Sequence, residues 1–304
     1  MKPLDSRWGH AINSHKLLDQ VKRGIHDTLA GKKEKSGSAS DASTRHYVNA
    51  VEADVIWSDA QQIVVMGHPP QVDGELSLSL FLDEMQALAT VLSADSSIAS
   101  AALSGNSSPL IVKLDFKSMR AFRASYEHLR MFIAAFPFPR GVFINADILV
   151  GPANTSEIAF YDAQEFLKDA SALESIDGTS SRNKIVLSVG WTTNNATEEE
   201  FRRGYSHEMV DAMLHVLAPY SHVHVTFPVR ATSVRSSWGP LQKLLNGPRN
   251  FGLTLWWAKT QLQDDELEWL YATLEEENAG FADRTFYDIL GFESFLQRRQ
   301  QRKS

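Results

Sequence analysis

Hydrophobic positions follow two alternating patterns along the chain. Short apolar runs of strand length alternate with longer segments whose apolar residues recur at helical spacing, almost to the last residue. Short apolar runs favour buried strands, whereas a repeat of about 3.6 residues favours amphipathic helices. Eight runs are predicted to be strands: residues 7–13, 47–57, 62–68, 110–117, 141–149, 184–193, 222–231 and 251–258.

The order of these elements predicts the fold class. Strands that alternate with helices favour parallel pairing through right-handed crossovers. Eight such units predict an α/β protein with a closed (β/α)8 TIM barrel. Only a few residues separate the strands at 47–57 and 62–68, which is too few for a crossover helix. We therefore expect an imperfect barrel, in which this helix is missing or replaced by a turn.

The length of 304 residues suits one barrel domain over residues 1–304, because such barrels use about 250 residues. Residues 31–46 are small, polar and low in complexity, and the pattern resumes after them. We interpret them as a flexible surface loop inside the domain. The basic tail at 296–304 is expected to fray and to be solvated in preference to contacting nucleic acid.

Charge and cysteine content narrow the function classes. The chain has 30 basic and 37 acidic residues, a net charge of −7. This balance argues against an extended nucleic-acid surface, although a locally basic pocket could still hold a small phosphorylated group. The absence of cysteine excludes disulfides, thiolate metal sites and a cysteine nucleophile. No window approaches the roughly 20 apolar residues of a membrane span, and no signal-peptide pattern is evident. We expect a cytoplasmic protein.

Polar residues gather on one face of most predicted strands. Alternate residues of a strand face opposite sides of the sheet. The residues on the polar face are Glu52 and Asp54; Lys113, Asp115 and Lys117; Asn145 and Asp147; Ser188, Gly190 and Thr192; His222, His224, Thr226 and Arg230; and Thr254 and Trp256. A barrel interior is normally filled with Val, Ile and Leu, and buried charges are costly without partners. We therefore predict a functional site at the C-terminal mouth of the barrel.

The carboxylates and histidines suggest a specific chemistry. Glu52, Asp54 and Asp115 could bind one hard divalent cation, Mg²⁺ or alternatively Ca²⁺ or Mn²⁺, through oxygen ligands. His10 and His68 end the first and third predicted strands and flank the carboxylate strand. One imidazole could accept a proton while the other donates one.

Cations complete this predicted site. Lys113, Lys117 and Arg230 could stabilise anionic oxygens. A metal, two imidazoles and several cations suit transfer at a phosphodiester. The simpler alternative is an internal ion-pair network of the three cations with the carboxylates. For His222 and His224 we prefer hydrogen bonding inside the barrel over a metal site.

Eight blocks in order, "WGHAINS", "EADV", "GHPP", "KLDFK", "INADIL", "LSVGWTT", "VTFPVRA" and "LTLWW", resemble the menorin family. The resemblance covers about residues 7–290. That family looks related to the phospholipase-C-like phosphodiesterases, which include glycerophosphodiester phosphodiesterases and spider-venom sphingomyelinase D.

The resemblance implies a role for individual residues. His10 and His68 would be the catalytic pair, and Glu52, Asp54 and Asp115 would be the metal ligands, for Mg²⁺. Lys117 would contact phosphate, Asn13 would lie beside His10, and Trp256 would line the site. The predicted substrate-binding set is therefore Lys117, Lys113, Asn13, Asn145, Asp147, Arg230 and Trp256.

The leading hypothesis is a metal-dependent phosphodiesterase in which His10 is the base and His68 the acid, with the two roles open to exchange. The reaction would give a cyclic phosphate or direct hydrolysis. The substrate would be a small phosphodiester: a lipid headgroup, a glycerophosphodiester, or a nucleotide or RNA end. The alternatives are a non-catalytic barrel that acts as a binding, adhesion or signalling scaffold, and an aldolase-type barrel with Lys113 as a Schiff-base lysine. The oligomeric state stays open.

Overall fold

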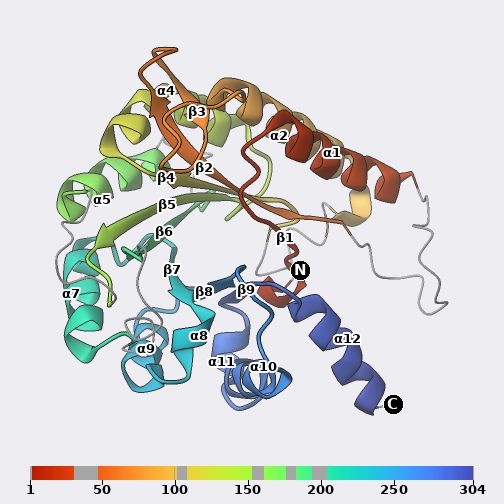
Figure 1. The fold of residues 1–304 in the computed structure, drawn as a ribbon, viewed down its shortest axis with the longest axis vertical. Helices are drawn as coiled ribbons and strands as arrows, with labels where there is room; N and C mark the ends of the chain where they lie inside the picture. Colours follow the sequence, from red (N-terminus) through yellow and green to blue (C-terminus); the bar gives the residue numbers. More distant parts are fainter. Residues whose placement is uncertain are drawn as a thin grey trace.

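The computed structural model describes residues 2–30, 47–98, 100, 108–152, 161–175, 183–193 and 204–303. A sheet of parallel strands occupies the centre, and helices surround it (Figure 1). The predicted loop at 31–46 lies outside the described residues. Among the described residues, no helix is both long enough and apolar enough to cross a membrane.

All strands of the described residues belong to one nine-stranded sheet. They are β1 (Trp8–Gly9), β2 (Ala50–Ser58), β3 (Ile63–Met66), β4 (Ile111–Phe116), β5 (Val142–Leu149), β6 (Ile185–Trp191), β7 (Val225–Arg230), β8 (Phe251–Trp257) and β9 (Thr285–Ile289). Eight of them pair in the order β1-β2-β4-β5-β6-β7-β8-β9, and every pair along this path is parallel. The result is a nearly closed, imperfect (β/α)8 TIM barrel, as predicted.

Helices cover the outer face of the barrel (Figure 1). They are α1 (His15–Leu29), α2 (Leu78–Ala94), α4 (Met119–Ala135), α5 (Ala163–Ala172), α7 (His207–Leu217), α8 (Ala231–Val234), α9 (Trp238–Leu245), α10 (Asp264–Tyr271), α11 (Ala279–Ala282) and α12 (Phe292–Lys303). Serine hydroxyls cap several of them: Ser14, Ser77, Ser118 and Ser206 each accept a hydrogen bond from the backbone N–H three residues on. Each cap satisfies a donor that the first helical turn would leave unpaired.

Two strand assignments differ from the prediction. The predicted strand at 62–68 forms as β3, but its predicted place in the barrel is wrong, because β3 pairs antiparallel with β2 and lies off the barrel path. A connection of a few residues can close only a hairpin, since a parallel return needs a crossover. The eighth barrel strand is β9, Thr285–Ile289, which the apolar pattern did not reveal because it is short and contains Asp288.

The basic end of the chain also differs from the expectation of a frayed tail. Residues 292–303 form α12, and its arginines pair with acidic residues of the preceding helical segment. Arg298 lies 2.6 Å from Asp264, and Arg299 lies 3.0 Å from Glu268 and 2.8 Å from Glu276. These contacts hold α12 beside α10.

The barrel has two apolar regions, one on each side of the sheet. Outward-facing strand residues such as Val51, Ala53 and Leu114 pack against the helices in the main core. A smaller cluster fills the interior near the N-terminal ends of the strands: Ala50, Ile111, Phe143 and Val186, with Trp8 and Phe286 packed against it. We call this cluster the inner plug. Polar residues follow the plug two positions further along the same strands, so the interior is polar only towards the C-terminal mouth.

Candidate active site

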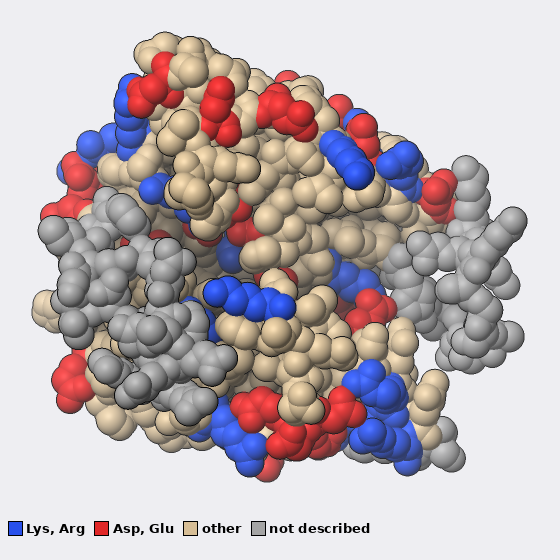
Figure 2. Space-filling model, viewed as in Figure 1, with Lys and Arg blue, Asp and Glu red and all other residues tan. Residues whose placement is uncertain are grey.

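Strand register brings the predicted polar face together. Glu52 is paired with Lys113, Asp54 with Asp115, and Asp115 with Asn145. Residues paired in a parallel sheet point to the same face, so the predicted grouping holds across three strands. Glu52, Asp54, Lys113 and Asn145 are buried. The face drawn in Figure 2 is hollowed near its centre, and acidic and basic side chains lie inside the hollow.

Three carboxylates form a compact cluster. One oxygen from each of Glu52, Asp54 and Asp115 lies within 4.8 Å of the others. Burial, together with the charges of Asp54 and Asp115, raises the pKa of Glu52, although His10 opposes the shift. Crowded, buried carboxylates are stabilised by a cation, and an all-oxygen ligand set suits a hard divalent ion. The residues present therefore fit a divalent metal ion.

Lys117 bridges two members of this cluster. Its Nζ lies 2.8 Å from Oδ1 of Asp54 and 2.6 Å from Oδ2 of Asp115. Burial opposes the charged form of Lys117, but the two carboxylates raise its pKa above the ordinary range. The same ammonium, with Lys113, lowers the pKa of Asp115 against the effect of burial. Lys117 thus forms the predicted ion pairs with Asp54 and Asp115. Glu52 has a different partner.

That partner is His10. Its Nδ1 lies 3.3 Å from Oε2 of Glu52 and 3.1 Å from Oδ2 of Asp288. Burial lowers the pKa of His10, but the Asp288 hydrogen bond and the charges of Glu52 and Asp288 raise it to about 9. The backbone N–H of Ala11 donates to the same Glu52 oxygen at 2.7 Å. Glu52 therefore receives both a backbone donor and an imidazole from the loop after β1.

Asp288 is the residue of the candidate site that sequence reasoning missed. It lies on β9 and pairs in register with Trp256 of β8, which places it on the inner face. The available signal was the alternation in "TFYDI", where Phe286 and Asp288 share one face and Tyr287 the other. A five-residue run with one carboxylate is too short to stand out by periodicity.

Amide side chains brace the other two carboxylates. Asn13 donates from Nδ2 to Oδ2 of Asp54 at 2.7 Å and accepts from the Asp54 backbone N–H at 2.9 Å. Asn145 donates to Oδ1 of Asp115 at 2.7 Å, and the Ser188 hydroxyl donates to Asn145 at 2.5 Å. Such supporting hydrogen bonds fix the direction in which a carboxylate offers its oxygens.

The remaining predicted residues lie around the mouth. The guanidinium of Arg230 lies 5.5 Å from the ring centre of Trp256, in the range of a cation–π contact, and donates to the carbonyl of Thr193 at 3.3 Å. The Asp147 side chain lies against the backbone of Gly190, since a Cβ added at Gly190 would lie 3.0 Å from Oδ1 of Asp147. Lys113 lies 5.9 Å from the ring centre of Trp8.

His68 is positioned differently from His10. The backbone N–H of Gly67 donates to the carbonyl of Asp54 at 2.9 Å, which holds this segment beside the carboxylate strand. The His68 side chain is exposed, and its Nδ1 lies 2.6 Å from the carbonyl oxygen of Pro69. Within the described part of the chain, its imidazole makes no hydrogen bond or ion pair with the carboxylates. Of the two predicted histidines, only His10 is joined to the cluster.

Comparison with known proteins identifies the family. The Menorin N-terminal domain family matches residues 4–291. Protein FAM151B of Homo sapiens is 32% identical over 254 residues, which are 82% of this chain and 76% of that protein.

Two solved structures are only distantly similar. Plasmodium falciparum HPPK-DHPS with pteroate aligns with a TM-score of 0.34 and 9% identity, over 99% of this chain and 49% of that chain. Spore coat polysaccharide biosynthesis protein spsE of Bacillus subtilis gives a TM-score of 0.31 and 13% identity, over 97% of this chain and 68% of that chain. The family match and the FAM151B relative together show that this chain belongs to the menorin family.

Proposed function

We propose that this protein is a metal-dependent phosphodiesterase whose active site is the carboxylate cluster with His10. The observation that carries this proposal is the convergence of three carboxylates within 4.8 Å, one of which lies 3.3 Å from an imidazole. Metal-ligand oxygens beside an acid–base group are the components of metal-assisted phosphodiester cleavage. The motif series supports placing the family beside the phospholipase-C-like phosphodiesterases.

Glu52, Asp54 and Asp115 would hold the metal, with Mg²⁺ as the first candidate and Ca²⁺ or Mn²⁺ as alternatives. When bound, the ion would offset negative charge on the phosphoryl oxygens. Asn13 and Asn145 would keep Asp54 and Asp115 aimed at it through the hydrogen bonds described above. Lys117 already neutralises part of the same cluster and would provide the cation nearest to a bound phosphate.

His10 would exchange the proton. Its Nδ1 faces Asp288 and Glu52, so Nε2 is the nitrogen left to face a substrate. The side chain is 41% exposed, which makes Nε2 accessible from the mouth. Two carboxylates on Nδ1 fix the ring orientation and favour a proton there, as in other carboxylate–histidine pairs.

His68 would serve as the second acid–base group, carried by the segment after β3. The substrate would be a small phosphodiester, either a lipid headgroup, a glycerophosphodiester or an RNA end. Attack by a neighbouring hydroxyl would give a cyclic phosphate, and attack by water would give direct hydrolysis. Arg230 over Trp256 would bind the group flanking the phosphate through charge and stacking.

A non-catalytic binding role is the second candidate, and one observation favours it. Lys117 satisfies two of the three carboxylates without a metal, so the cluster could be a purely structural ion-pair network. The two candidates differ in whether a divalent ion binds and whether a diester is cleaved.

The test is hydrolysis of bis(p-nitrophenyl) phosphate by the full chain, with Mg²⁺ and with excess chelator. We expect turnover that requires the metal and falls at least about 100-fold in His10→Ala and Glu52→Gln. His128→Ala and Asp59→Asn are matched controls, because both side chains are exposed and remote from the cluster. Equal rates for wild type and His10→Ala, or no metal-dependent turnover, would favour the binding role.

A further inference from the structure

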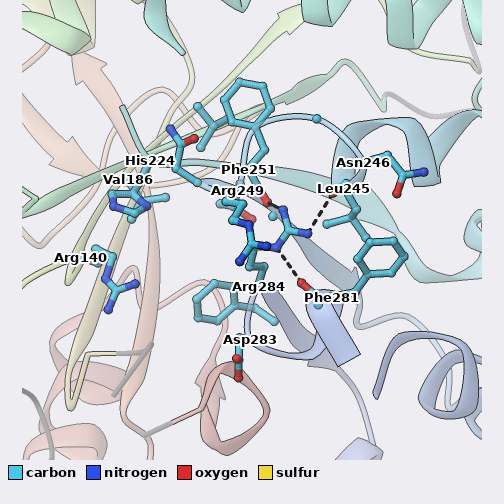
Figure 3. A pocket seen from close by; sticks show the side chains of 17 residues that line it. Arg140, Val186, His224, Leu245, Asn246, Arg249, Phe251, Phe281, Asp283 and Arg284 are labelled. Carbon is cyan, nitrogen blue, oxygen red and sulfur yellow. Dashed lines mark hydrogen bonds between the residues drawn. The ribbon is translucent and has the colours of Figure 1, made fainter. Parts of the chain in front are cut away.

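A cavity opens at the opposite end of the barrel from the carboxylate cluster. Its volume is about 500 Å³, within the range of small-molecule sites. Its walls come from the segments that precede β5, β7, β8 and β9, which carry Arg140, His224, Arg249 and Arg284 (Figure 3). Segments that precede barrel strands lie at the N-terminal end, so we call this cavity the lower pocket.

The inner plug separates the lower pocket from the candidate active site. Val186 and Phe286 belong to the plug region and also line the lower pocket. Phe286 packs edge-to-face against Phe143, with ring centres 5.4 Å apart. Ser188 and Asp288 follow two positions later on the same strands, on the other side of this apolar layer. The two sites are therefore independent, and this inference does not rest on the proposed function.

Positive charge gathers in the lower pocket. Arg140, Arg249 and Arg284 line it together with one carboxylate, Asp283. Arg249 is exposed, and in the described part of the chain neither it nor Asp283 forms an ion pair. By formal charge, the three arginines and Asp283 give these lining residues an excess of two positive charges, in a protein whose net charge is −7.

Arg284 is fixed in place by backbone carbonyls. It donates to Gly280 at 2.9 Å, to Phe251 at 2.8 Å and to Leu245 at 2.9 Å. Carbonyl oxygens orient a guanidinium without cancelling its charge, unlike a carboxylate. Its charge is thus held in a fixed position in the cavity wall.

The basic groups repel one another. Burial, and then the neighbouring charge of Arg249, lowers the pKa of Arg284. Burial, and then the charge of Arg140, lowers the pKa of His224, which favours the neutral imidazole. Like charges held around one cavity are relieved by a bound anion.

From this geometry we propose that the lower pocket binds a small organic phosphate monoester, with Arg140 and Arg249 as direct ligands and Arg284 as a fixed charge behind them. A phosphate monoester carries close to two negative charges at pH 7, which matches the excess in the lining. Guanidinium groups bind phosphate through paired N–H donors. Phe281 and Phe286 also line the cavity and offer apolar surface to the organic part.

The experiment is calorimetric titration of the full chain, in chelator, with phenyl phosphate. Arg249→Gln and Arg140→Gln are each expected to weaken binding about tenfold, since each removes a charge-assisted contact. Arg130→Gln is the matched control, because Arg130 lies on α4 and pairs with Glu127. Asp283→Asn removes the one lining carboxylate and is expected to tighten binding several-fold, a gain that misfolding cannot produce.

Two further ligands test the chemical class. Methyl phenyl phosphate and benzoate keep the ring but carry a single negative charge, and both are expected to bind at least about tenfold more weakly than phenyl phosphate. The proposal is overturned if wild type shows no saturable binding of phenyl phosphate, if Arg249→Gln and Arg140→Gln bind it as wild type does, or if benzoate binds equally well.

Discussion

At the scale of single residues, each of the three clustered carboxylates has charged or hydrogen-bonding partners. Glu52 accepts from the Ala11 N–H and faces His10, whereas Asp54 and Asp115 share Lys117. Buried charges without such partners would be strongly destabilising. The partners also differ in kind, because one carboxylate faces an imidazole and two contact an ammonium. In the proposed reaction, proton transfer and cation binding would fall to these neighbouring groups.

Asp288 is predicted to position His10 by charge as well as by hydrogen bonding. Asp288→Asn keeps an acceptor near Nδ1 but removes the charge, so the pKa of His10 should fall from about 9 towards its ordinary value of 6.5. Turnover of the test diester should fall roughly 10- to 100-fold, as for other partners of catalytic histidines. NMR titration of His10 in metal-free protein gives the pKa, and Asp59→Asn is the control. An unchanged pKa would contradict this role.

At the scale of elements, β9 decides whether the site is complete, because it carries Asp288. Its outward face is anchored by Tyr287, which stacks on Phe292 at 4.4 Å between ring centres and donates to Glu275 at 2.8 Å. β9 is also paired with β8, and just before β9 begins, the Arg284 carbonyl accepts a hydrogen bond from the Leu253 N–H at 2.9 Å. The position of His10's partner thus depends on contacts outside the site.

Gly252 permits the close approach of β8 and the start of β9. A Cβ at this position would lie 2.2 Å from the Arg284 carbonyl oxygen, so Gly252→Ala must push the strands apart. We expect the free energy of unfolding to fall by about 1–3 kcal/mol, measured by urea denaturation. Gly24→Ala is the control, because nothing lies within 4 Å of its added Cβ and alanine favours the α1 helix. Equal stability of Gly252→Ala and wild type would refute the steric argument.

Glu275 is predicted to make stability depend on pH. Burial raises its pKa from 4.5 to about 7, against the hydrogen bond from Tyr287. Between these values the folded chain binds more protons than the unfolded chain, so stability falls as pH rises, and the cost is complete above about pH 7.

The substitution Glu275→Gln gives a side chain that is uncharged at every pH. The free energy of unfolding of the variant should exceed that of wild type by on the order of 1 kcal/mol at about pH 8. This value is smaller than the full pKa shift implies, because Glu275 is partly exposed to solvent. The difference should vanish near pH 4.5, below which both states of wild type are protonated. Thermal unfolding at the two pH values measures this. If the stability difference between the variant and wild type is the same at both pH values, the charge of Glu275 is not its cause.

At the scale of the whole molecule, the barrel separates two regions that differ in their charged groups. Carboxylates with cationic partners lie at the C-terminal mouth, arginines line the lower pocket, and the inner plug lies between them. The net charge of −7 conceals this separation, because a total says nothing about distribution. The proposed metal site and the proposed anion site would be kept apart by this apolar layer.

Metal binding at the mouth should stabilise the whole fold. A ligand at 100 times its Kd adds about 2.7 kcal/mol to the free energy of unfolding, which for a chain of this size corresponds to a rise in Tm of roughly 5 °C. We expect Mg²⁺, Mn²⁺ or Ca²⁺ to produce such a rise in differential scanning calorimetry. Glu52→Gln should abolish it and Asp59→Asn should retain it. A rise of equal size in both variants would place the ion elsewhere.

The sequence by itself determined which residues share the polar face. Period-two alternation is a local property of each strand, so Glu52, Asp54, Asp115 and Asn145 could be grouped before any strand was placed. The alternation of strands and helices likewise determined the barrel class, and the motif blocks indicated the family.

Only the tertiary structure decided the presence of β9 and the content of the lower pocket. The hydrogen bond between His10 and Asp288 joins residues 278 positions apart, and it exists because β1 and β9 stand at the two ends of the strand order in a barrel that nearly closes. The three arginines of the lower pocket come from separate connecting segments in the same way. Periodicity in the sequence shows which residues share one face of a helix or strand. Which elements pack against that face depends on how the connecting segments arrange the elements in space.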